Sequence, residues 1–138
     1  MPSRLRYEEA PEVCAMVDIL SAMEEFSHID TRRVYCVRSW GSRSRAVARI
    51  YGLPGPWVTV LGPGYVIEVI GERFYRLPLE DRVKTVIHEL LHIPSTFSGG
   101  LRPHGRLVNG RAVSRLYRRA VRLGLLDRIV EVLGDRGG

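Results

Sequence analysis

The sequence predicts a single α+β domain in which a small mixed sheet packs against several helices. Its 138 residues, with 45% hydrophobic and 26% charged positions, suit one globular core. Short β-branched and aromatic runs alternate with longer segments in which apolar residues recur every three or four positions. The sequence contains no internal repeat, low-complexity segment or linker, so we expect one domain over residues 1–138.

The first half of the chain predicts two helices and three strands. Residues 8–28 have apolar side chains at helical spacing and acidic residues in the first turn, where the helix dipole favours them. Residues 33–38 are β-branched and aromatic, as in a strand. A turn and a short helix are expected around 43–51. The runs 57–61 and 65–70, separated by Gly-Pro-Gly, predict a hairpin or two adjacent strands.

The second half of the chain predicts three helices. Residues 79–93 form the most strongly helical segment, which Pro94 ends. After an irregular stretch rich in glycine, proline and serine, Asn109 is expected to cap a helix that extends to Leu123. A last short helix is expected over 125–133.

The basic charge of the chain permits a polyanionic partner. Lys and Arg number 21 against 15 Asp and Glu, which gives a formal net charge of +6. One basic stretch covers 38–49, with Trp40 and Tyr51 nearby, and arginine beside aromatic side chains suits nucleic acid. A second arginine stripe lies on the predicted helix after Asn109. Its members are Arg111, Arg115, Arg118, Arg119 and Arg122. A solvated helix face is the alternative explanation of both stretches.

Cysteine usage and hydropathy predict a cytoplasmic protein. Cys14 and Cys36 are 22 positions apart, form neither a disulfide framework nor a CxxC motif, and are expected to be inert core residues in a reducing compartment. The sequence contains no run of about 18 apolar residues, so we expect no membrane-spanning helix. A single asparagine, no glutamine and many charges fit a heat-exposed organism, although high-GC codon bias would produce the same excess of arginine.

The predicted helix 79–93 carries an HExxH motif, His88-Glu89-Leu90-Leu91-His92. The two histidines lie about 40° apart around the helix, roughly opposite its apolar stripe. Core histidines do not fit this placement, whereas a solvated face remains an alternative. Two imidazoles one turn apart can bind one divalent metal ion, with zinc the best fit, and Glu89 can accept a proton from a bound water molecule.

A zinc ion needs a third protein ligand, and His104 is the best candidate. It follows the motif in a loop whose Gly99 and Gly100 allow the chain to fold back over the helix end. His28 is distant in sequence and is the weaker candidate. Asp81 or a distant glutamate is a further alternative.

The run IHELLHIPSTFSGGLRPHG resembles the signature of a small, mainly archaeal and phage family of metallopeptidases of the zincin type. The upstream segments VYCVRSWGSRSRAVARIYGLP and YVIEVI are also similar to that family, so the resemblance spans about residues 30–110. It implies a minimal zincin-like fold, whereas a peptide or protein substrate is inferred from the chemistry of the HExxH motif. It also implies that His88, His92 and His104 bind Zn2+ and that Glu89 is the catalytic base.

Zincins hold an extended substrate along a strand beside the motif helix, and residues 65–70 are the expected strand, with a plain structural strand as the alternative. Arg102 and Tyr65 are candidate donors to an oxyanion. The sequence therefore predicts a zinc-dependent metallopeptidase. The alternative is a basic nucleic-acid-associated or regulatory protein whose metal is structural.

Overall fold

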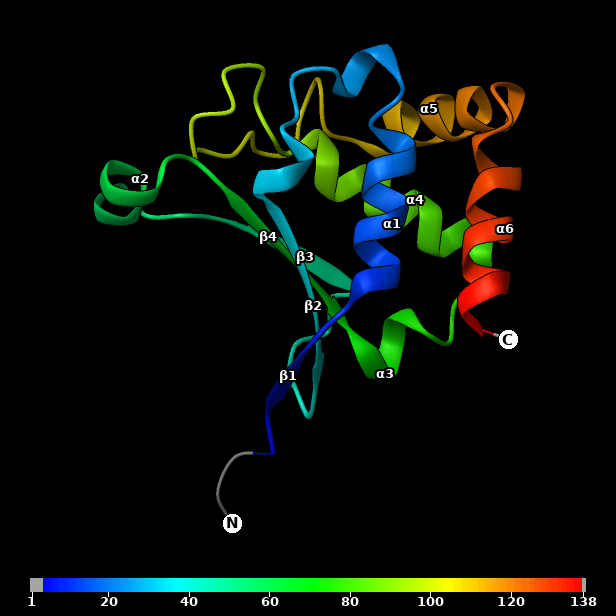
Figure 1. Cartoon of the computed structure of the whole chain (residues 1–138), viewed down its shortest axis with the longest axis horizontal. Helices are drawn as coiled ribbons and strands as arrows, with labels where there is room; N and C mark the ends of the chain where they lie inside the picture. Colours follow the sequence, from blue (N-terminus) through cyan, green and yellow to red (C-terminus); the bar gives the residue numbers. More distant parts are fainter. Residues whose placement is uncertain (1–3, 138) are drawn as a thin grey trace.

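The computed structural model describes residues 4–137 and contains a mixed four-stranded sheet covered by helices on one face (Figure 1). The strand order is β1-β2-β4-β3, with β2 and β4 parallel and the other two pairs antiparallel. The strands are β1 (Arg6–Glu9), β2 (Val34–Trp40), β3 (Ala48–Gly52) and β4 (Tyr65–Ile70). The α-helices are α1 (Pro11–Leu20), α2 (Gly55–Leu61), α3 (Gly71–Phe74), α4 (Leu79–Leu91), α5 (Gly110–Arg122) and α6 (Leu125–Gly137). These elements confirm the predicted α+β class.

The core lies between the sheet and helices α1 and α4. α1 packs on β2, α4 packs on β3, and α5 and α6 lie outside them against α4 and α1 (Figure 1). Strand β4 is central, and its side chains Tyr65, Ile67 and Val69 are fully buried among those of the helices. The motif helix α4 is therefore supported from the sheet side and from both neighbouring helices.

The helix predicted over residues 8–28 is much shorter in the structure. α1 begins at Pro11, because proline suits the first turn of a helix and not its interior. It ends before Met23, which is extended and begins a separate 3-10 turn. Ahead of it, the exposed and charged strand β1 shows no strand pattern in the sequence, and its pairing with β2 brings it into the sheet. The buried residues of α1 are the predicted Val13, Met16, Val17 and Leu20.

Two predictions between the first strand and the motif helix are wrong. The expected short helix around 43–51 is instead the loop before β3 and most of that strand, which pairs with β4. The expected strand at 57–61 belongs to α2, a helix whose residues are all partly or fully exposed. Pro56 suits its first turn, and the Arg33 guanidinium holds its end through the carbonyls of Leu61 and Gly62.

The C-terminal half follows the prediction closely. α4 is the helix predicted over 79–93; it ends two residues earlier than expected, with His92 as its C-cap residue. The Asn109 side chain accepts a hydrogen bond from the backbone N–H of Ala112 at 2.8 Å and so caps α5 as expected. α6 extends a few residues beyond its predicted end.

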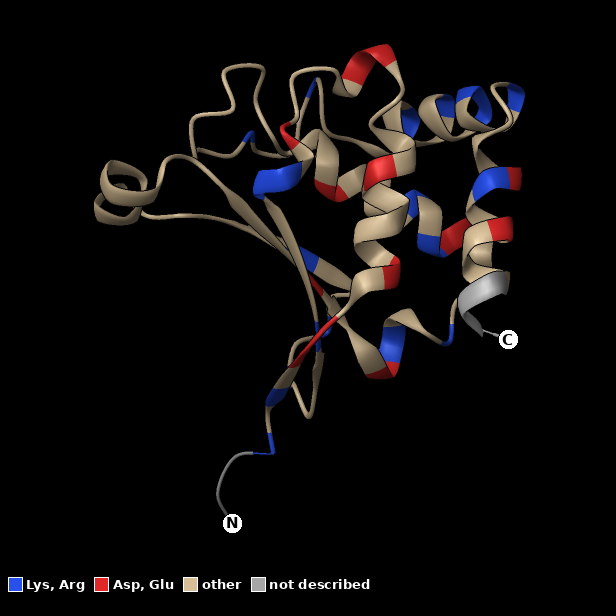
Figure 2. Ribbon diagram, viewed as in Figure 1, with Lys and Arg blue, Asp and Glu red and all other residues tan. Residues whose placement is uncertain are grey.

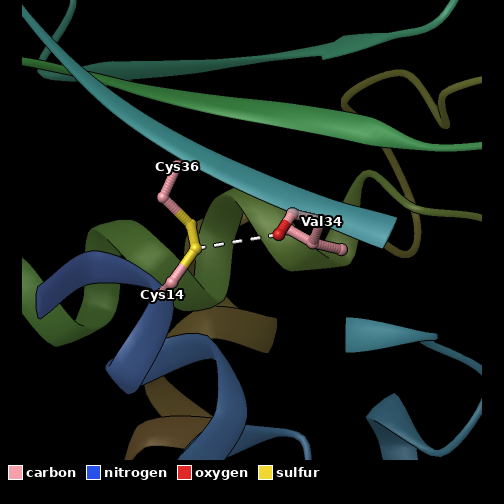
Figure 3. The surroundings of a disulfide bond; sticks show 3 residues. All are labelled: Cys14, Val34 and Cys36. Atoms are coloured by element: carbon pink, nitrogen blue, oxygen red, sulfur yellow. Dashed lines mark hydrogen bonds between the residues drawn. A yellow bond between two sulfur atoms is a disulfide. The ribbon is translucent and has the colours of Figure 1, made fainter. Parts of the chain in front are cut away.

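The prediction that Cys14 and Cys36 are inert core thiols is wrong. Cys14 of α1 and Cys36 of β2 form a disulfide, with their Cα atoms 5.6 Å apart, and Cys14 Sγ lies 3.7 Å from the carbonyl oxygen of Val34 (Figure 3). They are thus not independent core thiols, because pairing of the helix with the sheet brings them together. The cytoplasmic location stays a prediction. In the described part of the chain, no helix has the length and apolar character needed to cross a membrane.

Candidate metal centre

Helix α4 presents its histidines to a cleft because its opposite side is held in the core. Val83, Val86 and Ile87 are fully buried against the sheet and the neighbouring helices. His88 and His92, one turn apart, are half-buried and line a cleft of about 660 Å³. The amphipathic pattern of the helix therefore fixes which way both imidazoles point.

Three histidines meet at this cleft. The side chains of His88, His92 and His104 offer ring nitrogens that all lie within 4.8 Å of one another, and Nε2 of His88 lies 2.9 Å from Nε2 of His104. Their ring centroids are 4.8–5.2 Å apart. Three imidazoles converging on one point are a donor set that suits zinc, and they leave a fourth tetrahedral position open. Among residues 4–134, whose side chains the structure describes, this histidine cluster is the only such group.

The loop after α4 carries His104 back to the helix end through backbone contacts. The N–H of Arg102 donates to the carbonyl of His92 at 2.7 Å, and the carbonyl of Arg102 lies 2.6 Å from Nδ1 of His92. Because a carbonyl oxygen only accepts hydrogen bonds, Nδ1 of His92 carries the proton. The Nε2 lone pair of His92 is then free to bind a metal ion.

Tyr65 holds the same loop from the core side. Its fully buried hydroxyl accepts a hydrogen bond from the N–H of Gly99 and donates one to the carbonyl of Gly100, both at 2.8 Å. Its ring contacts Phe97 edge-on, with 5.0 Å between the centroids. Tyr65 thus does not reach the cleft, and its predicted role as an oxyanion donor is wrong. Arg102 does line the cleft.

Glu89 lies at the wall of the cleft in an apolar setting. It is 6% exposed, and burial raises the pKa of its carboxyl to about 7. Burial, followed by the proximity of His92 and His104, lowers the pKa of His88, so the imidazole favours its neutral form. A carboxyl that exchanges its proton near neutral pH beside the neutral imidazole of His88 suits metal binding and proton transfer.

The strand beside the cleft is β3 and not the predicted segment 65–70. That segment is β4, which pairs with β2 on one side and with β3 on the other, so neither of its edges is available to a peptide. β3 is the terminal strand of the sheet, and residues 46–50 line the cleft opposite His88 and His92. The alternation of Ala48 and Ile50 with polar neighbours is the signal that identifies it in the sequence.

The remaining candidate ligands lie elsewhere. Nε2 of His28 lies 3.0 Å from the carbonyl oxygen of Ile93, and His28 is not part of the histidine cluster. Asp81, at the start of α4, is also outside the cluster.

The fold and the site together define a small α+β protein with a candidate metal centre in a cleft beside an edge strand. A sequence model of the family described as "Putative phage metallopeptidase" matches residues 5–131. The chain belongs to this metallopeptidase family, which confirms the resemblance seen in the sequence. Searches of curated proteins and of solved structures return no match.

Proposed function

We propose that the protein is a zinc-dependent peptidase in which Glu89 is the general base and His88, His92 and His104 bind the metal ion. The observation that carries this proposal is the convergence of the three imidazoles beside a buried carboxyl, at a cleft bounded by an edge strand. A structural metal site usually has four protein ligands, whereas this cluster supplies three. The donor count therefore favours catalysis over the alternative of a purely structural metal.

The chain's own groups have separate roles in peptide hydrolysis. A divalent ion at this site supplies Lewis acidity toward the scissile carbonyl and makes water a better nucleophile at neutral pH. Glu89 takes the proton from the attacking water and delivers it to the leaving amine, for which a carboxyl with a pKa of about 7 is well suited. The hydrogen bond from Nδ1 of His92 to Arg102 keeps the imidazole oriented during turnover.

We further propose that the substrate binds as an extended chain along β3. The free edge of this strand faces the cleft, so main-chain hydrogen bonds can align a peptide in front of Glu89 and the histidine cluster. Ala46, Val47 and Leu101 give the cleft apolar walls. The Arg102 guanidinium, which donates to the carbonyl of Leu91 at 3.4 Å, lines the same cleft and is the candidate oxyanion donor.

Metal content and hydrolysis of an unfolded protein substrate, measured on the same preparation, test this function. The protein is purified without a metal-affinity column. We expect about one zinc per chain, and we expect the chelator-treated protein to lose activity and to regain it with zinc. Glu89→Gln should keep the zinc and lose at least about 100-fold in kcat, since general-base catalysis contributes that much.

Glu80→Gln is the matched control, because it removes an exposed carboxylate from the first turn of the same helix. It should leave both the zinc content and the rate unchanged. A wild-type protein without stoichiometric metal, or a Glu89→Gln variant with full activity, would contradict the proposal.

A further inference from the structure

Four arginines of α5 form one stripe that points away from the core. Arg111, Arg115, Arg118 and Arg122 follow one another at spacings of four, three and four residues, which places them within about 60° of one another around the helix. All four side chains are exposed. Figure 2 shows the repeated basic positions along α5, which contains no acidic residue. We call these four residues the α5 stripe.

The charges of the α5 stripe are not neutralised within the described residues. The ion pairs of residues 4–134 involve other cations, and Arg119, which lies beside the stripe, pairs with Glu25. Like charges three and four residues apart on a helix destabilise it. The neighbouring helix α6 instead exposes Asp127 and Glu131 together with Arg128, the mixture expected of an ordinary solvated face.

The other basic stretch found in the sequence does not form a comparable surface. Arg38 is paired with Glu8 and Glu12, and Arg49 with the buried Glu68. The aromatic side chains of that stretch are also engaged, since the Trp40 indole donates to Glu8 and the Tyr51 hydroxyl to Glu68. Arg43 and Arg45 of that stretch are exposed and outside these ion pairs, but they lie on the loop before β3. Among the described elements, α5 therefore carries the longest row of exposed cations outside the ion pairs.

A hydrogen-bonded turn at Asn109 connects the α5 stripe to the candidate metal centre. The Asn109 amide donates to the carbonyls of Gly105 and Arg106 at 2.7 and 3.1 Å, while its oxygen caps α5. The beginning of α5 is thus fixed to the loop that carries His104. A ligand that lies along the stripe starts beside the cleft and continues away from it.

We propose that the α5 stripe binds the phosphate backbone of nucleic acid without reading its sequence. The stripe is about 16 Å long, and over that length of its axis a duplex carries about ten phosphates on its two strands, which is enough to give each arginine a partner. Guanidinium groups bind phosphate through paired hydrogen bonds. Tyr117, the aromatic residue of α5, is partly buried, lies about 100° around the helix from Arg118 and has its ring against Lys84, so the stripe offers no ring on which bases could stack. Protein interfaces are centred on apolar and aromatic side chains, whereas the exposed apolar residues Val121 and Leu123 lie beside the α5 stripe and not within it.

When the α5 stripe is bound to nucleic acid, the cleft lies close to that nucleic acid. Proteins bound to the same nucleic acid are then near the cleft. Binding depends on α5 alone, so it does not require the metal ion or hydrolysis. The inference therefore stands or fails separately from the proposed peptidase function.

Fluorescence anisotropy with a labelled random-sequence duplex DNA tests the inference across a salt series, using the full-length protein. Each phosphate neutralised contributes about 0.9 to the slope of log K against log salt. Four contacts then predict a roughly 150-fold loss of affinity between about 50 and about 200 mM salt. The variant R111Q/R115Q/R118Q/R122Q should lower the slope by about 3 to 4. The control R4Q/R6Q/R32Q/R76Q removes the same charge from exposed positions elsewhere and should keep most of the affinity.

Glu89→Gln should bind the DNA as the wild type does, and circular dichroism should show that both quadruple variants remain folded. A labelled poly-glutamate peptide of equal charge is the competing ligand. Three results would overturn the proposal: no salt-dependent binding of the DNA, equal losses in the two quadruple variants, or tighter binding of poly-glutamate than of DNA.

Discussion

Arg102 is hydrogen-bonded to His92 twice, once through its backbone N–H at 2.7 Å and once through its carbonyl at 2.6 Å. Both contacts use the main chain of Arg102, while its guanidinium lies at the cleft. The residue therefore has two separable functions. The backbone orients a candidate metal ligand, and the side chain is available to a substrate.

Arg102→Ala separates these two functions. The variant keeps both backbone hydrogen bonds, so we expect its zinc affinity to stay within about threefold of the wild type. If the guanidinium donates to the developing oxyanion, kcat/KM should fall by about 100-fold or more. Zinc competition with a chromophoric chelator and steady-state kinetics measure the two effects. Arg106→Ala, an exposed neighbour in the same loop, is the control, and a large loss of zinc affinity in Arg102→Ala would disprove the separation.

Tyr65→Phe should weaken metal binding from inside the core. The variant leaves the N–H of Gly99 and the carbonyl of Gly100 without their partner, which costs about 1–3 kcal/mol and loosens the loop that carries His104. We expect zinc affinity to fall by about 10-fold, at the lower end of losses seen for residues that orient ligands. Isothermal titration with zinc measures this. Tyr35→Phe, whose side chain is exposed, should change nothing, and an unchanged affinity in Tyr65→Phe would show that the loop does not need the hydroxyl.

The chemistry of the site was more predictable from the sequence than its surroundings. His88, Glu89 and His92 lie on one strongly amphipathic helix, so local periodicity was sufficient to orient them. Glycines in the following loop correctly indicated that His104 could return to the helix end. In contrast, the alternation of Ala48 and Ile50 indicates a strand, but the position of β3 at the sheet edge beside the cleft depends on pairing with β4, a non-local contact that periodicity does not report.

The disulfide and Tyr65 also depend on non-local contacts, which the local sequence pattern does not report. Cys14 and Cys36 come together only because α1 packs on β2, and no spacing rule brings two cysteines of a helix and a strand into contact. Tyr65 was expected to donate to an oxyanion, and it belongs to the segment 65–70 that was expected to hold the substrate. The inward side of the central strand instead places its hydroxyl under the loop.

Removal of the Cys14–Cys36 disulfide should lower the stability of the whole domain and leave the histidine cluster intact. The bond closes a loop across a sequence separation of 22, for which the loss of chain entropy in the unfolded state corresponds to about 3 kcal/mol. We expect the free energy of unfolding of C14S/C36S, measured by urea denaturation, to be lower by that amount, and zinc affinity to stay near that of the wild type. The wild type with and without reductant provides the control. Equal stabilities would show that the bond is not formed in solution.

A peptide bound along β3 should be sensitive to the loss of its backbone donors. Along an extended chain, alternate amides point toward the neighbouring strand. N-methylation of the amides that face β3 should lower kcat/KM by about 10-fold or more, whereas methylation of the intervening amides should have a much smaller effect. Kinetics with a set of singly methylated peptides tests this alternation. A uniform effect at all positions would argue against binding by strand addition.

Glu68, a fully buried carboxylate of β4, links β4 to β3 through its side chain. Its Oε1 accepts hydrogen bonds from Arg49 at 3.2 Å and from Tyr51 at 2.6 Å, and both donors belong to β3. Burial on its own raises the pKa of Glu68, but the polar groups of Ser39, Tyr51 and Arg49 outweigh it and the pKa lies below its ordinary value. A carboxylate whose pKa is lowered by folding stabilises the protein above its unfolded-state pKa and loses this effect as the pH falls through the folded-state value.

Glu68→Gln should therefore reduce the free energy of unfolding by about 1–2 kcal/mol at neutral pH, since the hydrogen bonds to a charged acceptor are replaced by weaker ones. The difference from the wild type should shrink as the pH falls below about 4, because the protonated carboxyl resembles an amide. Urea unfolding over a pH series measures both quantities. Glu24→Gln, at an exposed position, should differ from the wild type by less than about 0.5 kcal/mol throughout. A Glu68→Gln penalty that does not change with pH would show that the charge of Glu68 is not what holds β3 against β4.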